Sequence, residues 1–221
     1  MQTASDLPIE RMIRRVARHV RRCREPYVTQ ESRARREPFR VLISCMLSLR
    51  TKDETTAAAS ERLFALADTP GAILRLSEKR IARTIFPVGF YNTKARNIRA
   101  ICRQLLEQHG GRVPDDMDDL LALPGVGRKT ANLVLTMGYG KPGICVDTHV
   151  HRISNRWGWV RTKTPEQTEM ALRELLPRRY WIEFNNWLVT FGQNCCAPLS
   201  PWCSECPVES DCPKIGVARR R

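Results

Sequence analysis

The stretch LLALPGVGRKTANLVL, residues 120–135, decides the fold of this chain. An apolar helical face ends at Pro124, and a second apolar run starts at Ala131. Between them, Gly125 and Gly127 are expected to adopt backbone conformations that a side chain forbids. The pattern predicts a helix-hairpin-helix with the glycine turn at the N-terminus of the second helix. Because N–H groups and the positive end of the helix dipole face outward there, the expected ligand is a phosphate of a nucleic-acid backbone.

The composition favours a globular protein that binds a polyanion. The chain has 221 residues, of which 42% are hydrophobic and 27% charged, enough for one large core or two modest ones. Lysine and arginine number 37 against 23 aspartates and glutamates, a net charge of +14. This excess favours DNA or RNA as the partner, although a basic surface can also serve solubility alone.

Membrane and export signals are not expected. No apolar run approaches the roughly 18 residues of a membrane helix, and the basic N-terminus continues into arginines rather than a signal core. We therefore expect a cytoplasmic, nucleoid-associated protein with no membrane partner. Thiols stay reduced in that compartment, so the nine cysteines are expected as metal ligands or core residues rather than disulfides.

The hydrophobic spacing predicts helices throughout. No segment shows sustained alternation of period two, so the expected fold class is all-α. Residues 1–30 read as one amphipathic helix with an arginine-rich face, and residues 39–49 as a buried central helix. Asp53 is expected to cap the helix that follows it. Further helices are expected at 55–67, 77–85, 93–109, 165–176 and 179–194, with others starting at 68–70, 114 and 146.

The turn at residues 87–92 introduces an aromatic and basic cluster. Phe90 and Tyr91 precede Lys94 and Arg96, a composition typical of a surface that touches nucleic acid or wedges a base stack. The alternative is that both rings belong to the core, and we expect this for Tyr91.

Four cysteines near the C-terminus follow the spacing C-x6-C-x2-C-x5-C, at Cys196, Cys203, Cys206 and Cys212. The segment is too rich in proline to be helical, so the four sulfurs can converge on one centre. Structural zinc sites usually combine two CxxC pairs, and this tail has one. We therefore favour an iron-sulfur cluster and keep zinc as the alternative. Cys195 leaves one ambiguity in the register.

The hairpin LPGVGRKTA, the VDTH that follows and the cysteine tail together resemble the endonuclease III family of DNA glycosylases, the helix-hairpin-helix group with a [4Fe-4S] cluster. This resemblance implies two helical domains with a DNA-binding groove between them. One would join residues 1–30 to 142–221 and hold the cluster, and the other, residues 31–141, would carry the hairpin at about 118–135. It also implies removal of oxidised pyrimidines from duplex DNA and cleavage of the strand at the resulting abasic site. We expect a monomer.

The family's functional residues map onto this chain by the same resemblance. Lys129 is the implied catalytic lysine, Asp147 the implied catalytic aspartate, and the four spaced cysteines the implied cluster ligands. From the hairpin alone, Lys129 reads as a phosphate contact, and Asp147 alone reads as a helix cap. The helix dipole, the adjacent Arg128 and apolar surroundings would favour the neutral lysine amine that a nucleophile requires. The expected DNA-contacting residues are Arg50, Phe90, Gly125, Val126, Gly127 and Arg128.

Three departures from the family pattern bear on specificity. Arg50 stands where the family commonly has a glutamine, and Phe90 where it often has a leucine. The loop at residues 197–202, often basic in the family, has no charge here. Two other functions therefore stay open: a monofunctional mismatch glycosylase, and a non-catalytic iron-sulfur protein that binds DNA.

Overall fold

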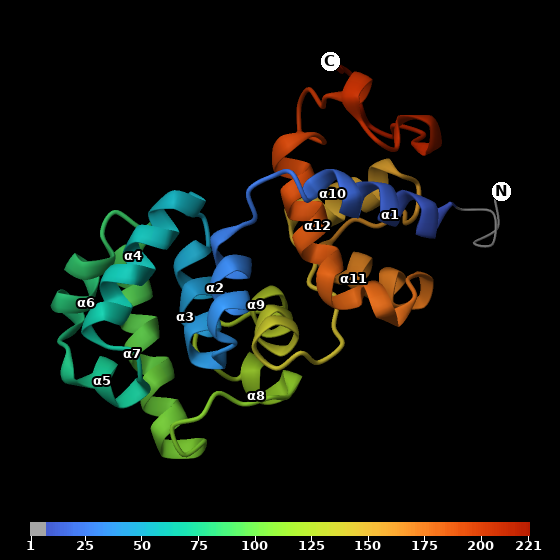
Figure 1. Cartoon of the computed structure of the whole chain (residues 1–221). Coiled ribbons are helices and arrows are strands. Elements are labelled where there is room, and N and C mark those ends of the chain that lie inside the picture. The colour runs from blue at the N-terminus through green and yellow to red at the C-terminus, as the bar shows by residue number, and fades with distance from the viewer. Residues whose placement is uncertain (1–7) are drawn as a thin grey trace. The chain divides into compact units, whose positions relative to one another are not determined.

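The computed structural model describes residues 8–221, and within them it contains helices, turns and loops without a strand (Figure 1). The predicted all-α fold is confirmed. The chain divides into two compact units, which we call the hairpin unit, Tyr27–Gly143, and the cysteine unit, which joins the segment ending at Pro26 to Ile144–Arg221. None of the described helices combines the length and the apolar character needed to cross a membrane.

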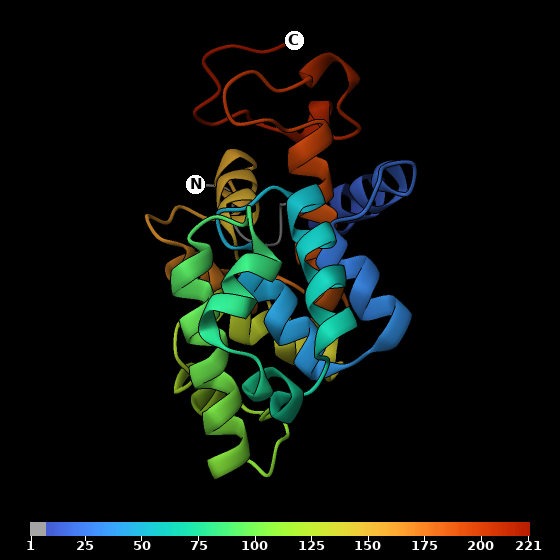
Figure 2. The same cartoon turned by 90° about the vertical axis from the view of Figure 1, so that its left-hand side faces the viewer.

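The hairpin unit is built around α3 (Pro38–Ser48), in which every residue from Phe39 to Leu47 is buried. This confirms the predicted central helix, whose nearly continuous apolar sequence leaves no polar face for solvent. Helices α2, α4, α7 and α9 pack around it, and α5 and α6 pack along α7 (Figure 2). The other elements are α2 (Tyr27–Arg35), α4 (Asp53–Leu66), α5 (Pro70–Arg75), α6 (Glu78–Ile85), α7 (Tyr91–Gln108), α8 (Met117–Leu121), α9 (Arg128–Leu133) and the π-helical turn η2 (Val134–Gly138).

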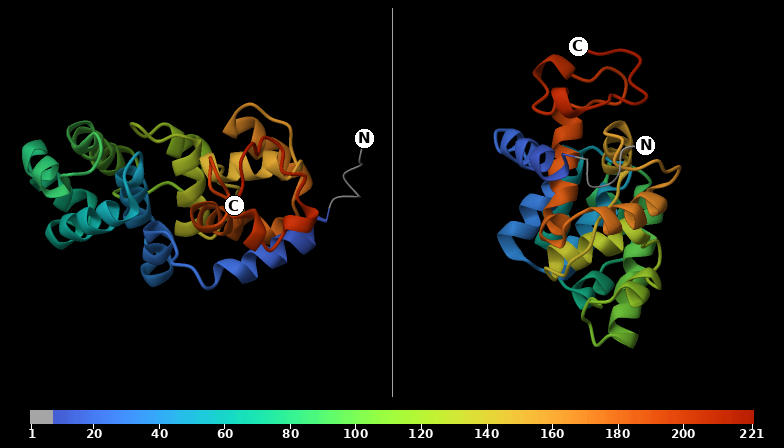
Figure 3. Two further views of the ribbon diagram at one scale, coloured as in Figure 1. Left: turned by 90° about the horizontal axis from the view of Figure 1, so that it is seen from above. Right: turned by 90° about the vertical axis from the view of Figure 1, so that its right-hand side faces the viewer.

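The cysteine unit is centred on α12 (Trp181–Asn194), whose Phe184 and Phe191 are fully buried. The apolar face of α1 (Ile9–Val20) packs against α12, and α10 packs on it as well (Figure 3). Beyond α12 the chain forms only short turns of 3-10 helix. The remaining elements are α10 (Thr148–Arg156), α11 (Pro165–Leu175), η3 (Arg178–Tyr180), η4 (Cys203–Glu205) and η5 (Glu209–Asp211).

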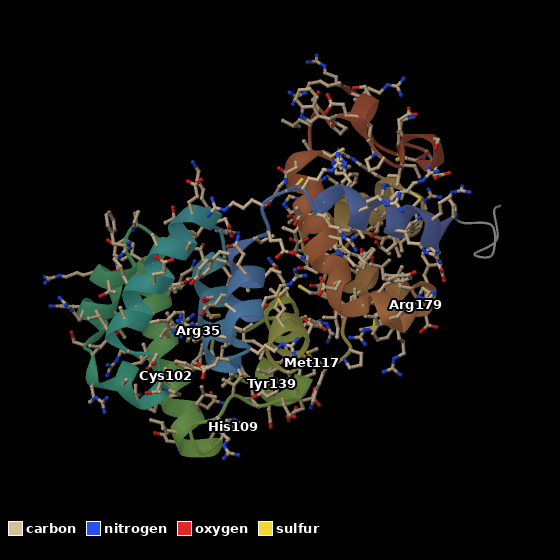
Figure 4. All side chains as sticks on the ribbon, in the orientation of Figure 1. Arg35, Cys102, His109, Met117, Tyr139 and Arg179 are labelled. Carbon is tan, nitrogen blue, oxygen red and sulfur yellow. The ribbon has the colours of Figure 1, made fainter. Side chains whose placement is uncertain are left out.

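The prediction of a single helix over residues 1–30 is wrong. Residues 1–7 lie outside the described part, α1 ends at Val20, and α2 starts in the other unit at Tyr27. Pro26 accounts for the break, because proline disfavours helical backbone in the residue before it and lacks an N–H. The polar face of α1 is partly ion-paired: Glu10 binds Arg14 and also Arg179, which is labelled in Figure 4.

The expected cap at Asp53 is also wrong. α4 begins at Asp53 itself, so this side chain lies inside the helix, and the N-cap position is Lys52, whose side chain makes no capping bond. Both carboxylate oxygens of Asp53 instead accept the backbone N–H of Tyr27, at 3.0 Å. Asp53 therefore ties the first residue of α2 to the first residue of α4.

Candidate functional site

The predicted helix-hairpin-helix is present as α8, a tight turn and α9. Asp116 caps α8 by accepting the N–H groups of Asp118 and Asp119. Leu120 and Leu123 are buried, and the turn closes with a hydrogen bond from the N–H of Val126 to Leu123. Apolar packing and backbone bonds thus hold the hairpin.

The two hairpin glycines have different roles. Gly125 has a φ of +76°, which favours glycine, and a Cβ atom there would lie 2.5 Å from Nδ2 of Asn97, whose side chain would have to shift. Gly127 is the N-cap of α9 with an ordinary φ of −104°, and no atom lies within 4 Å of where its Cβ would be. The expectation that both glycines need special backbone is therefore wrong for Gly127, whose open surroundings admit a close approach from outside.

Lys129 lies in the first turn of α9, half-buried, with its positive charge acting on α3. Burial raises the pKa of the Cys45 thiol to about 12, and the charge of Lys129 opposes that rise. The neighbouring Val126 is 7% exposed, so its side chain is buried. The hairpin thus presents a lysine beside a glycine turn and against an apolar helix.

Asp147 belongs to the cysteine unit and is the N-cap of α10. Its Oδ1 accepts the N–H groups of His149 and Val150, both at 2.9 Å. The side chain is 9% exposed. The capping role is therefore present, and it fixes the direction of a nearly buried carboxylate.

Helix α10 approaches α12 closely just after this cap. A Cβ on Gly192 would lie 2.3 Å from Nδ1 of His149, so glycine is needed there for contact between the two helices. Arg152 donates to the carbonyl of Cys196 at 2.8 Å, and burial lowers the pKa of its guanidinium. The start of α10 is thus anchored on α12 and on the first residue of the cysteine segment.

Arg50 and Phe90 lie together in the hairpin unit, Arg50 between α3 and α4 and Phe90 between α6 and α7. Arg50 follows α3 with a φ of +51°, and Phe90 precedes α7 with a φ of +57°. The guanidinium carbon of Arg50 lies 5.8 Å from the centre of the Phe90 ring, and Phe90 is 64% exposed. We call these two residues the tip pair.

Lys94 and Tyr91 do not lie where the sequence suggests. Lys94, expected at a nucleic-acid surface, is only 6% exposed. Tyr91, expected in the core, is half-buried and packs edge-on against Phe86, with the ring centres 5.3 Å apart. Helical phase accounts for Lys94, which α7 turns inward with Ala95 and Ile98. Tyr91 shares that face but is the first residue of α7.

The cysteines near the C-terminus line one cavity of about 340 Å³, a volume that includes open solvent. Cys195, Cys196, Cys203, Cys206 and Cys212 all contribute, together with charged side chains that include Arg156 and Lys214. Among residues 8–221 no three histidine, cysteine or acidic side chains are arranged to hold a single metal ion. The four spaced cysteines thus share one cavity, and their convergence on a single centre stays a prediction.

Burial and nearby hydrogen-bond donors shift the pKa values of these thiols. Burial raises the pKa of Cys196, opposed by Arg156, whose Nη1 lies 3.4 Å from its sulfur. A hydrogen bond from Cys195 lowers the pKa of Cys206, whereas burial raises that of Cys212 to about 11. Cys195 therefore lies beside the four spaced thiols and makes a hydrogen bond to one of them, that of Cys206.

The uncharged loop at residues 197–202 is covered by arginines from elsewhere. Arg156 donates to the carbonyls of Ala197 and Pro198. The guanidinium of Arg221 lies 4.1 Å from the ring centre of Trp202, and the backbone of Arg221 bonds to Pro201 and Ser204. Sequence reasoning missed Arg156, Arg221 and Lys94, because each acts on residues far away in the chain.

Comparisons with known proteins agree with this geometry. Residues 43–178 match the model of the HhH-GPD superfamily of base excision DNA repair proteins. Endonuclease III of Thermotoga maritima is 51% identical over 176 residues, which cover 80% of this chain and 83% of that protein.

Solved structures give the same answer. A trapped covalent intermediate of endonuclease III with DNA matches with a TM-score of 0.85 and 33% identity over 97% of both chains. A thermostable thymine-DNA glycosylase matches with a TM-score of 0.82 and 26% identity, over 93% of this chain and 95% of that one. The predicted family is confirmed: the chain belongs to the endonuclease III family of the HhH-GPD superfamily, and it is a DNA-binding glycosylase of base excision repair.

Proposed function

We propose that this glycosylase removes oxidised pyrimidines from duplex DNA and then cleaves the strand at the abasic site, with Lys129 as the nucleophile. The observation that carries the proposal is the position of Lys129, in the first turn of α9 directly after the Gly125–Gly127 turn and against the buried face of α3. The substrate would be a DNA duplex that contains a damaged base or an abasic site, bound by a monomer at the nucleoid.

The first step is extrusion of the damaged nucleotide. A stacked base shields the sugar carbon that must be attacked, and a damaged base costs less to unstack. The tip pair supports this step, because an exposed aromatic ring with a guanidinium beside it can fill the space that the nucleotide leaves. The N–H groups at the start of α9 would hold a backbone phosphate, and open space at Gly127 lets that phosphate come close.

The second step is attack by Nζ of Lys129 on C1′ of the deoxyribose. A bond forms between nitrogen and C1′ as the bond to the base breaks, and the base leaves with a proton. Ring opening gives a Schiff base, which acts as an electron sink. Removal of a proton from C2′ then expels the 3′ phosphate by β-elimination.

Asp147 is proposed to support the attack as an acceptor. The amine must lose a proton to become a nucleophile, and positive charge develops at the sugar as the base departs. A nearly buried carboxylate held by two backbone N–H bonds can take that proton or stabilise that charge. Its capping bonds occupy Oδ1, and the proposal assigns the chemistry to the other oxygen.

The four spaced cysteines are proposed to hold a [4Fe-4S] cluster, the cofactor typical of the family. They fit such a group because their thiols line one cavity, together with the positive side chains of Arg156 and Lys214. A cluster bound by four thiolates is anionic, and nearby cations offset that charge. Base excision and β-elimination need no redox change, so the cluster would supply structural order to residues 196–212.

Incision and borohydride trapping test the proposal. The wild-type chain should cut duplexes containing thymine glycol, dihydrouracil or an abasic site, and borohydride should trap a covalent complex. Lys129→Ala should abolish trapping but retain binding. Asp147→Asn keeps a capping side chain, so we expect an unchanged melting temperature with excision reduced about a hundredfold.

The alternatives predict different results. Failure of every damaged duplex to be cut or trapped would contradict the proposal and favour a DNA-binding protein without catalysis. The structural match to a thymine-DNA glycosylase makes a duplex with a T·G mismatch the natural comparison substrate. Excision of that thymine without trapping would favour the monofunctional mismatch enzyme.

A further inference from the structure

Lys94 carries a buried charge for which the proposed chemistry has no use. It lies on α7, one turn after Phe90, and its side chain is 6% exposed. Its Nζ atom lies 2.8 Å from the carbonyl oxygen of Leu47, 2.6 Å from that of Leu49 and 3.2 Å from Oγ1 of Thr51. An ammonium group has three donors, and here three acceptors meet them.

These acceptors lie at the C-terminal end of α3, where helix carbonyls lack partners within the helix. α3 ends at Ser48, so Leu47 is in its last turn and Leu49 is the residue that leaves it. A positive charge at the C-terminal end of a helix also interacts favourably with the helix dipole. Lys94 therefore completes the end of α3 from another helix, directly before the strained backbone of Arg50.

Thr51 extends the same network to the loop that carries Phe90. Its hydroxyl donates to the carbonyl of Leu49 at 3.2 Å and accepts the N–H of Gly89, also at 3.2 Å. A Cβ on Gly89 would lie 2.7 Å from the carbonyl oxygen of Arg50, so the two loops are in direct backbone contact. Hydrogen bonds made by Lys94 and Thr51 thus hold both loops in place next to Arg50 and Phe90.

We propose that Lys94 is a positioning residue that holds Arg50 and Phe90 in the one arrangement in which they enter the duplex together. Both tip residues have left-handed backbone, φ of +51° and +57°, which an L-residue adopts only when its surroundings impose it. The network supplies that constraint on both sides. The inference rests on the proposed function, since it assigns the tip pair to nucleotide extrusion.

The buried charge indicates function rather than stability. Burial lowers the pKa of Lys94 to about 8, so keeping this side chain protonated costs free energy in the folded state. A neutral amine has two donors and would leave one of the three acceptors without its partner. An apolar side chain would avoid the cost of burying charge, but it would lack the hydrogen bonds that hold the two loops.

Two substrates separate positioning from simple structural support. A duplex with thymine glycol requires a base to be unstacked, whereas a duplex with a preformed abasic site does not. In single-turnover reactions, Lys94→Met should slow thymine glycol excision about tenfold or more, because bonds to a charged donor are lost. Cleavage at the abasic site should slow less than about threefold, since the catalytic groups are untouched. Thr51→Val should show the same pattern with a smaller effect.

A matched control removes the same charge without the network. Lys79 is exposed on α6 of the same unit, so Lys79→Met should leave the ratio of the two rates unchanged. Fluorescence of 2-aminopurine placed opposite thymine glycol reports insertion of the tip pair before any chemistry. Binding of the wild type should raise this fluorescence, and Lys94→Met should give a smaller rise at saturating protein.

The outcomes are distinct. If wild-type protein neither excises nor traps, the proposed function fails, and the fluorescence of the variants still decides the role of Lys94. If the wild type is active and both rates fall together in Lys94→Met and Thr51→Val, or neither changes, the positioning role is contradicted. If circular dichroism shows that Lys94→Met does not fold, the ratio of the thymine glycol rate to the abasic-site rate in Thr51→Val decides whether the network has a positioning role.

Discussion

The hairpin and the cysteine segment are held in place by different physics. α8, the turn and α9 are fixed by buried leucines, by Asp116 as a cap and by a glycine that admits close packing. Residues 196–221 contain only short helical turns, and Val208 and Pro201 are among their few buried side chains. The hairpin is therefore complete without a ligand. The cysteine segment is contacted by arginines from other segments, and we expect it to depend also on the cluster proposed for its thiols.

Removal of one cysteine is expected to give the largest difference between the cysteine segment and the hairpin. Cys206→Ser should lose iron and make residues 196–221 sensitive to protease, because the segment has little core of its own. Residues 117–133, which form α8, the turn and α9, should keep the amide exchange rates of the wild type. Equal loss of protection in both regions would contradict the difference.

The buried lysine gives a pH test within the hairpin unit. Its pKa is lowered to about 8 in the folded chain, against an ordinary value of 10.5, so the unfolded chain binds more protons between these values. Stability should therefore rise with pH over this window relative to Lys94→Met, by up to about 3 kcal/mol. Urea unfolding of both proteins from pH 7 to 10.5 measures this difference. A constant difference would show that Lys94 titrates normally.

The hairpin glycines provide a matched pair of smaller effect. Gly125→Ala forces a side chain into left-handed backbone and against Asn97, so we expect a loss of about 1 to 3 kcal/mol in the free energy of unfolding. Gly127→Ala meets no atom, and stability should change by less than about 1 kcal/mol. Its affinity for duplex DNA should fall if a phosphate approaches there. Equal destabilisation by both substitutions would contradict the assignment.

Substitution of Arg156 should perturb the cysteine segment and leave the hairpin unchanged. Arg156→Met removes the donor to Cys196 and the bonds to Ala197 and Pro198, at an expected cost of about 1 to 3 kcal/mol. Iron release to a chelator should be faster than in the wild type, while the exchange rates of the hairpin stay the same. Arg161→Met, at an exposed position of the same unit, serves as the control.

The sequence predicted features that depend on near neighbours in the chain. The hairpin and the buried α3 each follow from spacing within one or two turns of helix. The four spaced cysteines line one cavity, because all four fall within one short segment, and the common centre expected from their spacing stays a prediction.

Features that depend on distant partners were not predictable in this way. Asp53 looks like a cap until the N–H of Tyr27 is placed beside it, and Lys94 looks like a surface cation until the end of α3 covers it. Arg221 reaches a loop 20 residues back, at Pro201. Local patterns carry no information about which remote carbonyl or carboxylate will be adjacent after folding.

The most direct test of the proposed chemistry is identification of the residue that becomes attached to DNA. The wild-type chain is incubated with a thymine glycol duplex and borohydride, and the trapped complex is digested and analysed by mass spectrometry. We predict that the peptide modified by the deoxyribose remnant contains Lys129 as the attachment site. Attachment at Lys94, at another lysine or at the N-terminal amine would contradict the account.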